Sequence, residues 1–315
     1  MKRLLLTFLI LVMVFSVAAC DSNKSEITSD KTTGVPDATT APDETNGPSE
    51  KPEESKKPTP PVTADNNVSL EERIIVDQNG VLITLEGLDF SDAYYAGKVK
   101  ILIENNTEKN INVRIWAIAV NDIMVDGDLN ATVATGKNSN ESITFDKDNF
   151  AAAGIEVIQT IDVVFDVYDT DTYTDIFVSE LVSLTTTGSE GYVQKYSGEG
   201  QLVFDQGDVN LVAREVVEYE DSYIGAAVVY YVENNSANHI SITARDTSVN
   251  GFMVDAGLYT KVLAGKRAYT SMEFYAEDLT ESDIEAITDI EASYSVFNPD
   301  TSDDYFVVNN VKTTF

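Results

Sequence analysis

The chain of 315 residues carries 21 Lys and Arg against 53 Asp and Glu, which gives a formal net charge of −32 at pH 7. Phosphate backbones are polyanions that are bound by clustered Lys and Arg, so this balance excludes nucleic acid as a partner. A single cysteine leaves no pair for a disulfide or a thiolate metal site. Burial of apolar side chains must therefore stabilise the folded part.

The chain begins with two basic residues, an apolar run from Leu4 to Val17, and then Ala18-Ala19-Cys20. A basic start, an apolar run of this length and small residues at its end predict a secretory signal over residues 1–19. A membrane-spanning helix needs about 20 apolar residues, which is more than this run provides. Val17-Ala18-Ala19-Cys20 resembles the lipobox of bacterial lipoproteins. The resemblance implies cleavage before Cys20, acylation of this cysteine with chains such as palmitate, and an extracytoplasmic protein anchored by lipid to the outer face of the cell membrane.

After Cys20 the composition changes to Thr, Ser, Pro, Glu, Asp and Lys, and residues 21–66 contain no aromatic side chain. Such a segment cannot bury enough apolar surface to offset its chain entropy. The sequence therefore predicts a disordered linker over residues 20–66. As a coil of about 45 residues, it would span roughly 35–40 Å on average and hold the folded part away from the membrane.

An internal repeat follows the predicted linker. The segment from Ile103 to Asp126 recurs from Val232 to Asp255, 129 positions later (232 − 103). Both copies contain a Glu-Asn-Asn-Thr/Ser turn and a Val-Asn-Asp/Gly turn followed by Met. The Gly-Lys pair at 136–137 recurs at 265–266. A repeat of this kind predicts two tandem modules of one design. We expect them at residues 67–187 and 201–315, with an inter-domain linker over 188–200.

The first predicted element of the folded part is a hairpin around Asn79-Gly80, which lies between two β-rich runs. Asn-Gly favours a type I′ turn, because both central residues of that turn need positive φ. Short helices are expected near residues 150–155 and, in the second copy, after Thr280. Thr280 would be the N-cap of that helix, with Asp283 in the capping-box position.

The strand predicted over residues 111–120 alternates between two faces. Comparison of the copies predicts that Ile111, Val113 and Ile115 face the core and that Arg114, Trp116 and Ile118 lie on the more polar face. About seven to nine short strands per copy and almost no helix indicate an all-β fold of two tandem antiparallel β-sandwiches.

The Asn-containing turns, the Gly-Lys pair and the short helix before an acidic strand resemble the immunoglobulin-like repeats of surface lipoproteins from Gram-positive, clostridia-type bacteria. The resemblance covers roughly residues 73–187 and 201–315. It implies tandem immunoglobulin-like sandwiches and carries no catalytic residue. Because the chain has one cysteine, the disulfide of antibody domains is not implied.

The sequence offers little catalytic chemistry. Its one histidine, His239, follows a polar turn, and the first copy has Asn110 in the same place. A thiol nucleophile would need a cysteine other than Cys20. We therefore expect no enzyme and no catalytic residue.

Acidic side chains gather at one predicted turn of each copy. They are Asp166, Asp169, Asp171 and Asp175 in the first copy and Asp300, Asp303 and Asp304 in the second. Ca²⁺ takes six to eight oxygen ligands, and acidic turns between strands can supply them. A structural Ca²⁺ is the one cofactor that these residues could hold, and a solvated acidic turn is the alternative.

Trp116 is the one tryptophan of the chain and the candidate partner-binding residue. Exposed aromatic rings anchor partners or stack on sugars, although the joint between the modules could also cover this ring. These observations predict a non-catalytic cell-surface protein that acts as an adhesion, scaffold or partner-binding module for an unidentified protein or cell-wall partner. The alternative is a ligand- or calcium-binding receptor component.

Overall fold

The computed structural model of the chain describes residues 68–315, with the exception of residue 221. The predicted signal peptide, Cys20 and the predicted linker over 20–66 lie outside the described residues. In the part of the chain that is described, no helix is long and apolar enough to cross a membrane. We call residues 68–187 the first half and residues 201–315 the second half.

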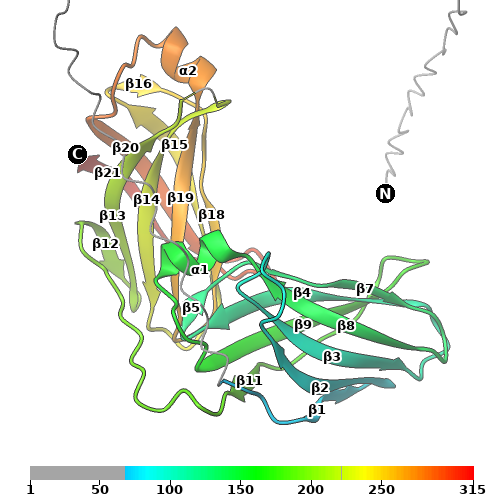
Figure 1. Cartoon of the computed structure of the whole chain (residues 1–315). Coiled ribbons are helices and arrows are strands. Elements are labelled where there is room, and N and C mark those ends of the chain that lie inside the picture. Colours follow the sequence, from blue (N-terminus) through cyan, green and yellow to red (C-terminus); the bar gives the residue numbers. More distant parts are fainter. Residues whose placement is uncertain (1–67, 221) are drawn as a thin grey trace, which may run out of the picture. The chain divides into compact units, whose positions relative to one another are not determined.

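The first half contains two groups of hydrogen-bonded strands (Figure 1). One is a sheet in the order β1-β2-β3-β8-β6, and the other is built around β4 and β9, with β5, β7, β10 and β11 paired to them. The strands are β1 (Arg73–Gln78), β2 (Val81–Asp89), β3 (Gly97–Asn105), β4 (Ile111–Val120), β5 (Ile123–Met124), β6 (Gly127–Asp128), β7 (Asn130–Val133), β8 (Asn138–Phe145), β9 (Thr160–Asp169), β10 (Asp175–Val178) and β11 (Val182–Thr185). A helix, α1 (Lys147–Ala153), joins β8 to β9.

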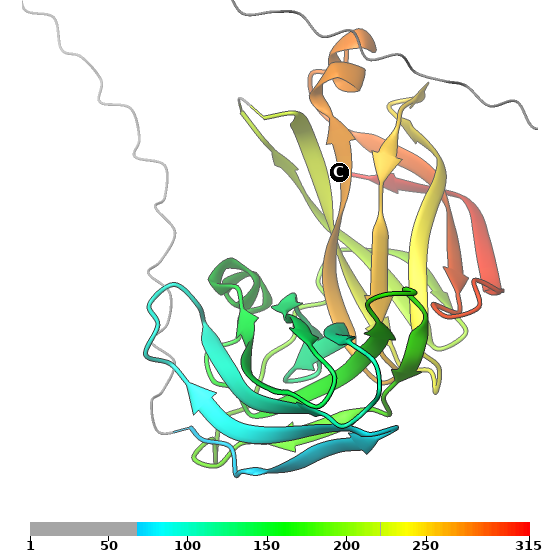
Figure 2. The same cartoon turned by 90° about the vertical axis from the view of Figure 1, so that its right-hand side faces the viewer.

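The second half repeats this arrangement (Figure 2). In one group, β19 pairs with β14 and β17, and β13 lies between β14 and β12. In the other group, β15 pairs with β16, β18 and β20, and β20 pairs with β21. Its elements are β12 (Gln201–Gln206), β13 (Val209–Glu218), β14 (Ile224–Asn234), β15 (Ile240–Val249), β16 (Phe252–Met253), β17 (Ala256–Gly257), β18 (Tyr259–Val262), β19 (Arg267–Tyr275), α2 (Ala276–Glu281), β20 (Asp289–Phe297) and β21 (Asp304–Thr314). Strands β4 to β7 reappear as β15 to β18 with their bounds displaced by 129 positions (240 − 111). The protein is all-β.

Each half has its own hydrophobic core, to which both of its groups of strands contribute. Strand β3 shows why, because its side chains alternate between buried and less buried positions, and Val99, Ile101 and Ile103 are fully covered. This alternation with period two places one face of a strand against the core. In the second core, Tyr230 and Tyr294 occupy the places that Ile101 and Phe165 occupy in the first.

The hairpin predicted around Asn79-Gly80 is confirmed. Strands β1 and β2 pair antiparallel, and the turn residues Asn79 and Gly80 have φ of 52° and 83°. Positive φ at both positions is what the type I′ turn requires, and Asn and Gly tolerate it best. The matching turn of the second half, at Gly207 and Asp208, also has positive φ at both residues.

The predicted faces of β4 are right at its start and wrong further along. Ile111 and Val113 are buried, but so is Ile118, which was expected on the polar face. The reason is an irregularity in the pairing of β4 with β9, because Ile115 faces Phe165 while Ala117 already faces Val164. One extra residue on β4 exchanges the two faces beyond it. That extra residue is Trp116.

The two helices of the described residues are short, and α1 has a side-chain cap whereas α2 has none. Asp146 precedes α1 and accepts hydrogen bonds from the backbone N–H groups of Asp148 and Asn149 at 2.7 and 3.1 Å. The predicted cap at Thr280 is wrong: α2 begins at Ala276, and the Thr280 hydroxyl donates to the Ala276 carbonyl at 2.7 Å.

Candidate functional site at the junction of the two halves

The two halves meet through backbone hydrogen bonding. Strand β5 of the first half lies parallel to β19 of the second, with Ile123 facing Arg267. The Arg267 backbone N–H donates to the Asp122 carbonyl at 2.8 Å. From the linker, the Tyr196 hydroxyl donates to the Asn121 carbonyl at 3.1 Å. The junction therefore extends one sheet from the first half into the second.

A buried ammonium group adds charge to this junction. Lys266 Nζ lies 2.6 Å from Asp122 Oδ1 and 2.5 Å from Asp162 Oδ2, and the Lys266 side chain is only 12% exposed. Burial by itself lowers the pKa of Lys266. The two carboxylates that accept its hydrogen bonds raise it, and the pKa ends above its ordinary value. Lys266 is thus held in its charged form.

Beside this ion pair lies a small apolar cluster of Ala117, Val164 and Leu263, with Trp116 and Met124 packed against it. Ala117 and Val164 come from the paired strands β4 and β9, and Leu263 comes from the turn between β18 and β19. The cluster joins the halves by apolar contact, separately from their two cores.

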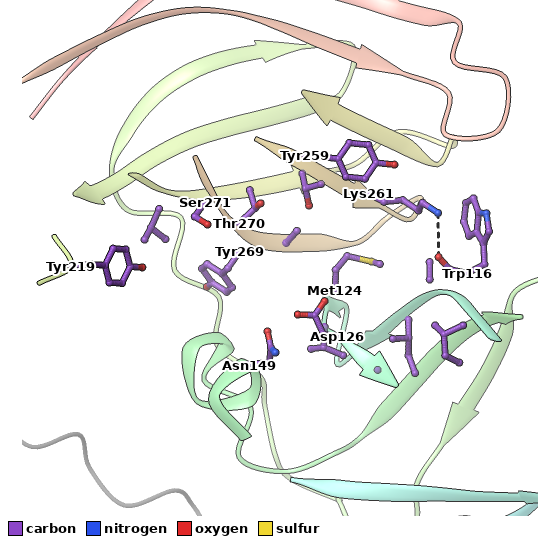
Figure 3. A pocket seen from close by; sticks show the side chains of 18 residues that line it. Trp116, Met124, Asp126, Asn149, Tyr219, Tyr259, Lys261, Tyr269, Thr270 and Ser271 are labelled. Atoms are coloured by element: carbon purple, nitrogen blue, oxygen red, sulfur yellow. Dashed lines mark hydrogen bonds between the residues drawn. The ribbon is translucent and has the colours of Figure 1, made fainter. Parts of the chain in front are cut away.

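Trp116 lies at the edge of this cluster and is capped by a cation. Lys261 Nζ lies 3.6 Å from the centre of the indole ring and donates to the Trp116 carbonyl at 3.2 Å (Figure 3). The ring centres of Trp116 and His239 are 5.8 Å apart, and His239 Nδ1 accepts the Ala264 N–H at 3.0 Å. Burial lowers the pKa of both Lys261 and His239. Desolvation strengthens the attraction between a cation and an aromatic face.

An open cleft of about 760 Å³ lies along the junction. Both halves line it, and Figure 3 shows Trp116, Met124 and Asp126 of the first half across from Tyr259, Lys261 and Tyr269 of the second. The other side chains named in that view are Asn149, Tyr219, Thr270 and Ser271. Among the lining residues the charged groups are Asp126 and Lys261. The cleft is therefore built from aromatic rings, a thioether, hydroxyls and little charge, in a protein that is otherwise strongly acidic.

Such a lining suits binding. Aromatic faces contact apolar or sugar surfaces, and hydroxyl and amide groups fix a ligand by hydrogen bonds. General acid–base catalysis needs a titratable group within reach of a reacting atom. His239 already accepts a backbone hydrogen bond at its Nδ1, and its side chain contacts Trp116 outside the cleft lining.

The acidic residues of the first turn are placed differently from one another. Asp166 is buried, and its Oδ2 accepts from Arg114 Nε at 2.7 Å, while its Oδ1 has no hydrogen-bond partner in the described part of the chain. Asp169 Oδ2 lies 3.0 Å from Lys109 Nζ, and Asp169 Oδ1 accepts the Asp171 N–H at 2.9 Å. These contacts, led by the backbone hydrogen bond, lower the pKa of Asp169.

Asp171 and Asp175 are exposed, as are the three predicted acids of the second half. There, Asp303 accepts from the Thr301 hydroxyl at 2.8 Å, Asp304 accepts from Ser295, and Asp300 donates its backbone N–H to Asn298. Within residues 68–220 and 222–315, no three His, Cys, Asp or Glu side chains are arranged to hold a metal ion. The calcium site stays a prediction of the sequence, with a solvated acidic turn as its alternative.

The repeated asparagines that revealed the duplication organise turns. Asn105 is buried, its amide donates to the carbonyls of Lys109 and Val133 at 2.8 and 2.9 Å, and its Oδ1 accepts from the Thr107 hydroxyl at 2.7 Å. Asn234 repeats these contacts with Asn238, Val262, Leu263 and Ser236. This is why the motif ends in Thr or Ser.

Sequence reasoning singled out Trp116 but missed the residues around it. Lys261, Leu263 and Lys266 lie in the second copy at places where the first has Thr132, Ala134 and Lys137. Lys261 and Leu263 could have been found from the sequence, because each differs in residue type from its equivalent in the first copy. A residue that differs from its equivalent is free to serve a contact that only one copy makes.

No protein-family model matches the chain, and no curated protein matches it. Similar solved structures include a protein of unknown function from Porphyromonas gingivalis W83, with a TM-score of 0.21 and 10% identity over 75% of this chain and 100% of that one. Red sea bream transglutaminase is similar with a TM-score of 0.18 and 9% identity over 73% of this chain. The match spans 29% of the transglutaminase chain. Neither likeness carries an argument about function.

Proposed function

We propose that this chain is a non-catalytic, lipid-anchored cell-surface protein whose two tandem immunoglobulin-like β-sandwiches bind a partner in the cleft at their junction. The observation that carries the proposal is the lining of that cleft. It brings Trp116, Tyr259 and Tyr269 together with Met124 around an open volume of about 760 Å³. Aromatic side chains and methionine are enriched where proteins bind partners.

The rest of the chain supports this reading. The repeated strand order and the separate core of each half support two sandwich modules. The lipobox-like residues ending at Cys20 and the Pro- and Thr-rich segment after it support an anchor and a linker. Together they describe a binding module carried on the outer face of the cell membrane.

The chemistry of the cleft restricts which class of partner it can bind. Asp126 and Lys261 oppose each other in charge, so the lining attracts neither a strong anion nor a strong cation by net charge. Tyr and Trp faces with Thr and Ser hydroxyls suit a sugar ring or an uncharged stretch of protein. A cell-wall glycan or a protein segment of low charge therefore fits best.

The test uses the fluorescence of Trp116, which is the only tryptophan in the chain. Purified cell-wall glycan fragments and surface-protein extracts are titrated into the chain from residue 21 onward, which lacks the anchor. We expect a saturable change in emission and a higher melting temperature, because a ligand at 100 times its Kd adds about 2.7 kcal/mol to the free energy of unfolding.

Tyr259→Ala should weaken this binding at least tenfold, since Tyr259 lies in the cleft and is 62% exposed. The matched control is Tyr173→Ala, which removes a similarly exposed ring outside the cleft lining. Equal affinity for the Tyr259→Ala and Tyr173→Ala variants would show that the partner binds elsewhere.

The alternative is an extracytoplasmic receptor component for a small ligand. Small-molecule sites measure about 300–1,000 Å³, and the volume of this cleft lies in that range. A monosaccharide, amino acid or other small solute that shifts Trp116 emission, with no effect of polymers, would favour the receptor.

A further inference from the structure

The junction has two complementary faces, and the repeat supplies a second copy of each. The receiving face consists of Asn121, Asp122 and Asp162 with the two residues of β5, all in the first half. The turn face is the segment 263–267 of the second half, which carries Lys266. The repeat places the equivalent of each face in the other half. The second turn face is the segment 134–138 of the first half, and the second receiving face lies around β16 in the second half.

The second turn face has the same backbone geometry as the first. The Lys137 N–H donates to the Ala134 carbonyl at 3.1 Å, as the Lys266 N–H donates to the Leu263 carbonyl at 3.1 Å. The glycines before the two lysines, Gly136 and Gly265, have φ of 65° and 71°. Segment 134–138 therefore presents a lysine in the way that the buried turn does.

The second receiving face also keeps its backbone geometry. Asn121 and Asn250 both have φ of 50°. The Asn121 N–H donates to the Thr160 carbonyl and the Asn250 N–H donates to the Asp289 carbonyl, both at 3.0 Å. Their side-chain oxygens accept matching pairs of backbone N–H groups: Gln159 and Thr160 at 2.8 and 3.1 Å, and Thr288 and Asp289 at 2.9 and 3.1 Å. Figure 1 shows β16 at one end of the second half, beside α2.

The residues of the second pair of faces are exposed, whereas their equivalents are covered. Ile123 of β5 is fully buried in the core of the first half and Met124 packs against the core of the second half, but Phe252 and Met253 of β16 are 53% and 69% exposed. The Lys266 side chain is 12% exposed, while Lys137 is an exposed residue. Two neighbouring exposed apolar side chains at the end of a sheet favour association with another chain.

We propose that the protein associates head to tail, with the Lys137 turn of one chain seated on the β16 face of a second copy. The internal junction is the template, because it already shows such a turn seated on such a face. Glu291 takes the place of Asp162, so one charge pair is kept as Lys137 with Glu291, while Gly251 stands in the place of Asp122. Lys312, which stands opposite Glu291, binds Asp289 at 3.0 Å instead.

The intermolecular contact is more polar than the internal one. Where the junction has Leu263 against Ala117 and Val164, the second pair of faces has Ala134 against Asp246 and Ser293. The side chain is smaller on the turn face and those on the receiving face are more polar. The contact lacks the apolar cluster and is therefore weaker and reversible, whereas the internal junction is permanent.

Because the two faces differ and lie on different halves, the contact is heterologous. A heterologous contact that does not close into a ring generates open chains of molecules. The inference goes beyond the binding proposed for the junction cleft and does not depend on it, since neither exposed face lines that cleft.

The experiment is analytical ultracentrifugation of the chain from residue 21 onward, at concentrations up to about 1 mM, which populate weak interfaces. About 0.15 M salt is needed, because it shortens the Debye length to about 8 Å and screens the repulsion between copies of an acidic protein. We expect the average mass to rise continuously with concentration, without a plateau at a dimer.

Single substitutions then separate the two faces. Phe252→Lys on the receiving face and Lys137→Glu on the turn face should each abolish the rise, and neither residue is buried, so the fold is kept. An equimolar mixture of these two variants should form dimers and nothing larger, because only one intact pair of faces remains. Ile74→Lys, at a 58% exposed residue outside both faces, is the control and should associate like the unaltered chain.

Charge exchange supplies a further check. Glu291→Lys should weaken association at least tenfold, and the chain with both Lys137→Glu and Glu291→Lys should recover it. A mass that stays monomeric at every concentration would overturn the proposal, as would association that Phe252→Lys leaves unchanged. Neither result would bear on binding in the junction cleft.

Discussion

Lys266 Nζ lies 2.5 Å from Asp162 Oδ2, and this contact joins a side chain of the second half to a buried carboxylate of the first. Asp122 accepts a second hydrogen bond from the same ammonium at 2.6 Å. Asp162 also accepts a hydrogen bond from Ser183 of its own half. The ion pair is therefore part of a network that fixes where one half sits on the other.

Lys266→Ala should destabilise the protein, because Asp162 stays buried and loses its positive partner. We expect the free energy of unfolding to fall by about 1–3 kcal/mol, the range for leaving a buried acceptor without its donor. Urea denaturation measures it. Lys137→Ala removes the equivalent but exposed lysine and should change stability by less than about 0.5 kcal/mol. Equal effects of both substitutions would mean that the junction contributes little.

Alkaline pH should unfold the second half through two buried tyrosines. The Tyr230 and Tyr294 hydroxyls are 3.2 Å apart, and burial raises the pKa of both residues, that of Tyr230 most strongly. Their contribution is complete below the ordinary tyrosine pKa of about 10 and is lost as the pH rises through the folded pKa values. Lys266, whose pKa is also raised, acts in the same direction.

The variant with both Tyr230→Phe and Tyr294→Phe isolates this effect. The first half has Ile101 and Phe165 at these places, so apolar side chains fit the core. Circular dichroism followed through alkaline titration should give an unfolding midpoint at higher pH than in the unaltered chain, with little change at neutral pH. An unchanged midpoint would assign the alkaline transition to other groups.

The repeated turn asparagines should be structural. Asn105→Ala removes buried hydrogen bonds to two carbonyls and should lower stability by about 1–3 kcal/mol in urea denaturation. Asn106→Ala, at the exposed neighbour, should be nearly neutral. If the two substitutions cost the same, the motif would owe its repetition to something other than this turn.

Calcium should leave the melting temperature unchanged. Asp166 and Asp169 already bind Arg114 and Lys109, so their carboxylates face cationic side chains. Melting curves in Ca²⁺ and in EDTA test this expectation. A saturable rise with Ca²⁺ that Asp169→Asn removes would instead establish the metal site that the acidic turn predicts.

Local signals in the sequence predicted local structure well. The Asn79-Gly80 turn and the alternating strands follow from backbone geometry and burial, which act within a few residues. The face of Ile118 was wrong because one added residue in β4 leaves no mark in the apolar pattern. The α2 cap was wrong because β19 extends to Tyr275, so the helix starts there and not at the better capping residue.

The junction could not be predicted from either copy alone. Lys261 reaches Trp116, and Lys266 reaches Asp162, across more than a hundred residues of sequence. No short-range rule places such pairs together. The sequence could flag Trp116 as unusual, but its neighbours depend on how the second half docks, which is set by contacts distributed over both halves.

The bridge between Ser69 and Thr187 determines how a mechanical load would travel. The N–H of each residue donates to the carbonyl of the other, at 3.1 and 2.8 Å, where the described chain enters the first half and where it leaves. A load applied to the chain before Ser69 and to the chain directly after Thr187 would peel this antiparallel bridge open from its end, and the strands of the first half would lie outside the path of the force. The strands of the first half would then bear the load only after the bridge had ruptured, so the bridge would protect them from smaller forces.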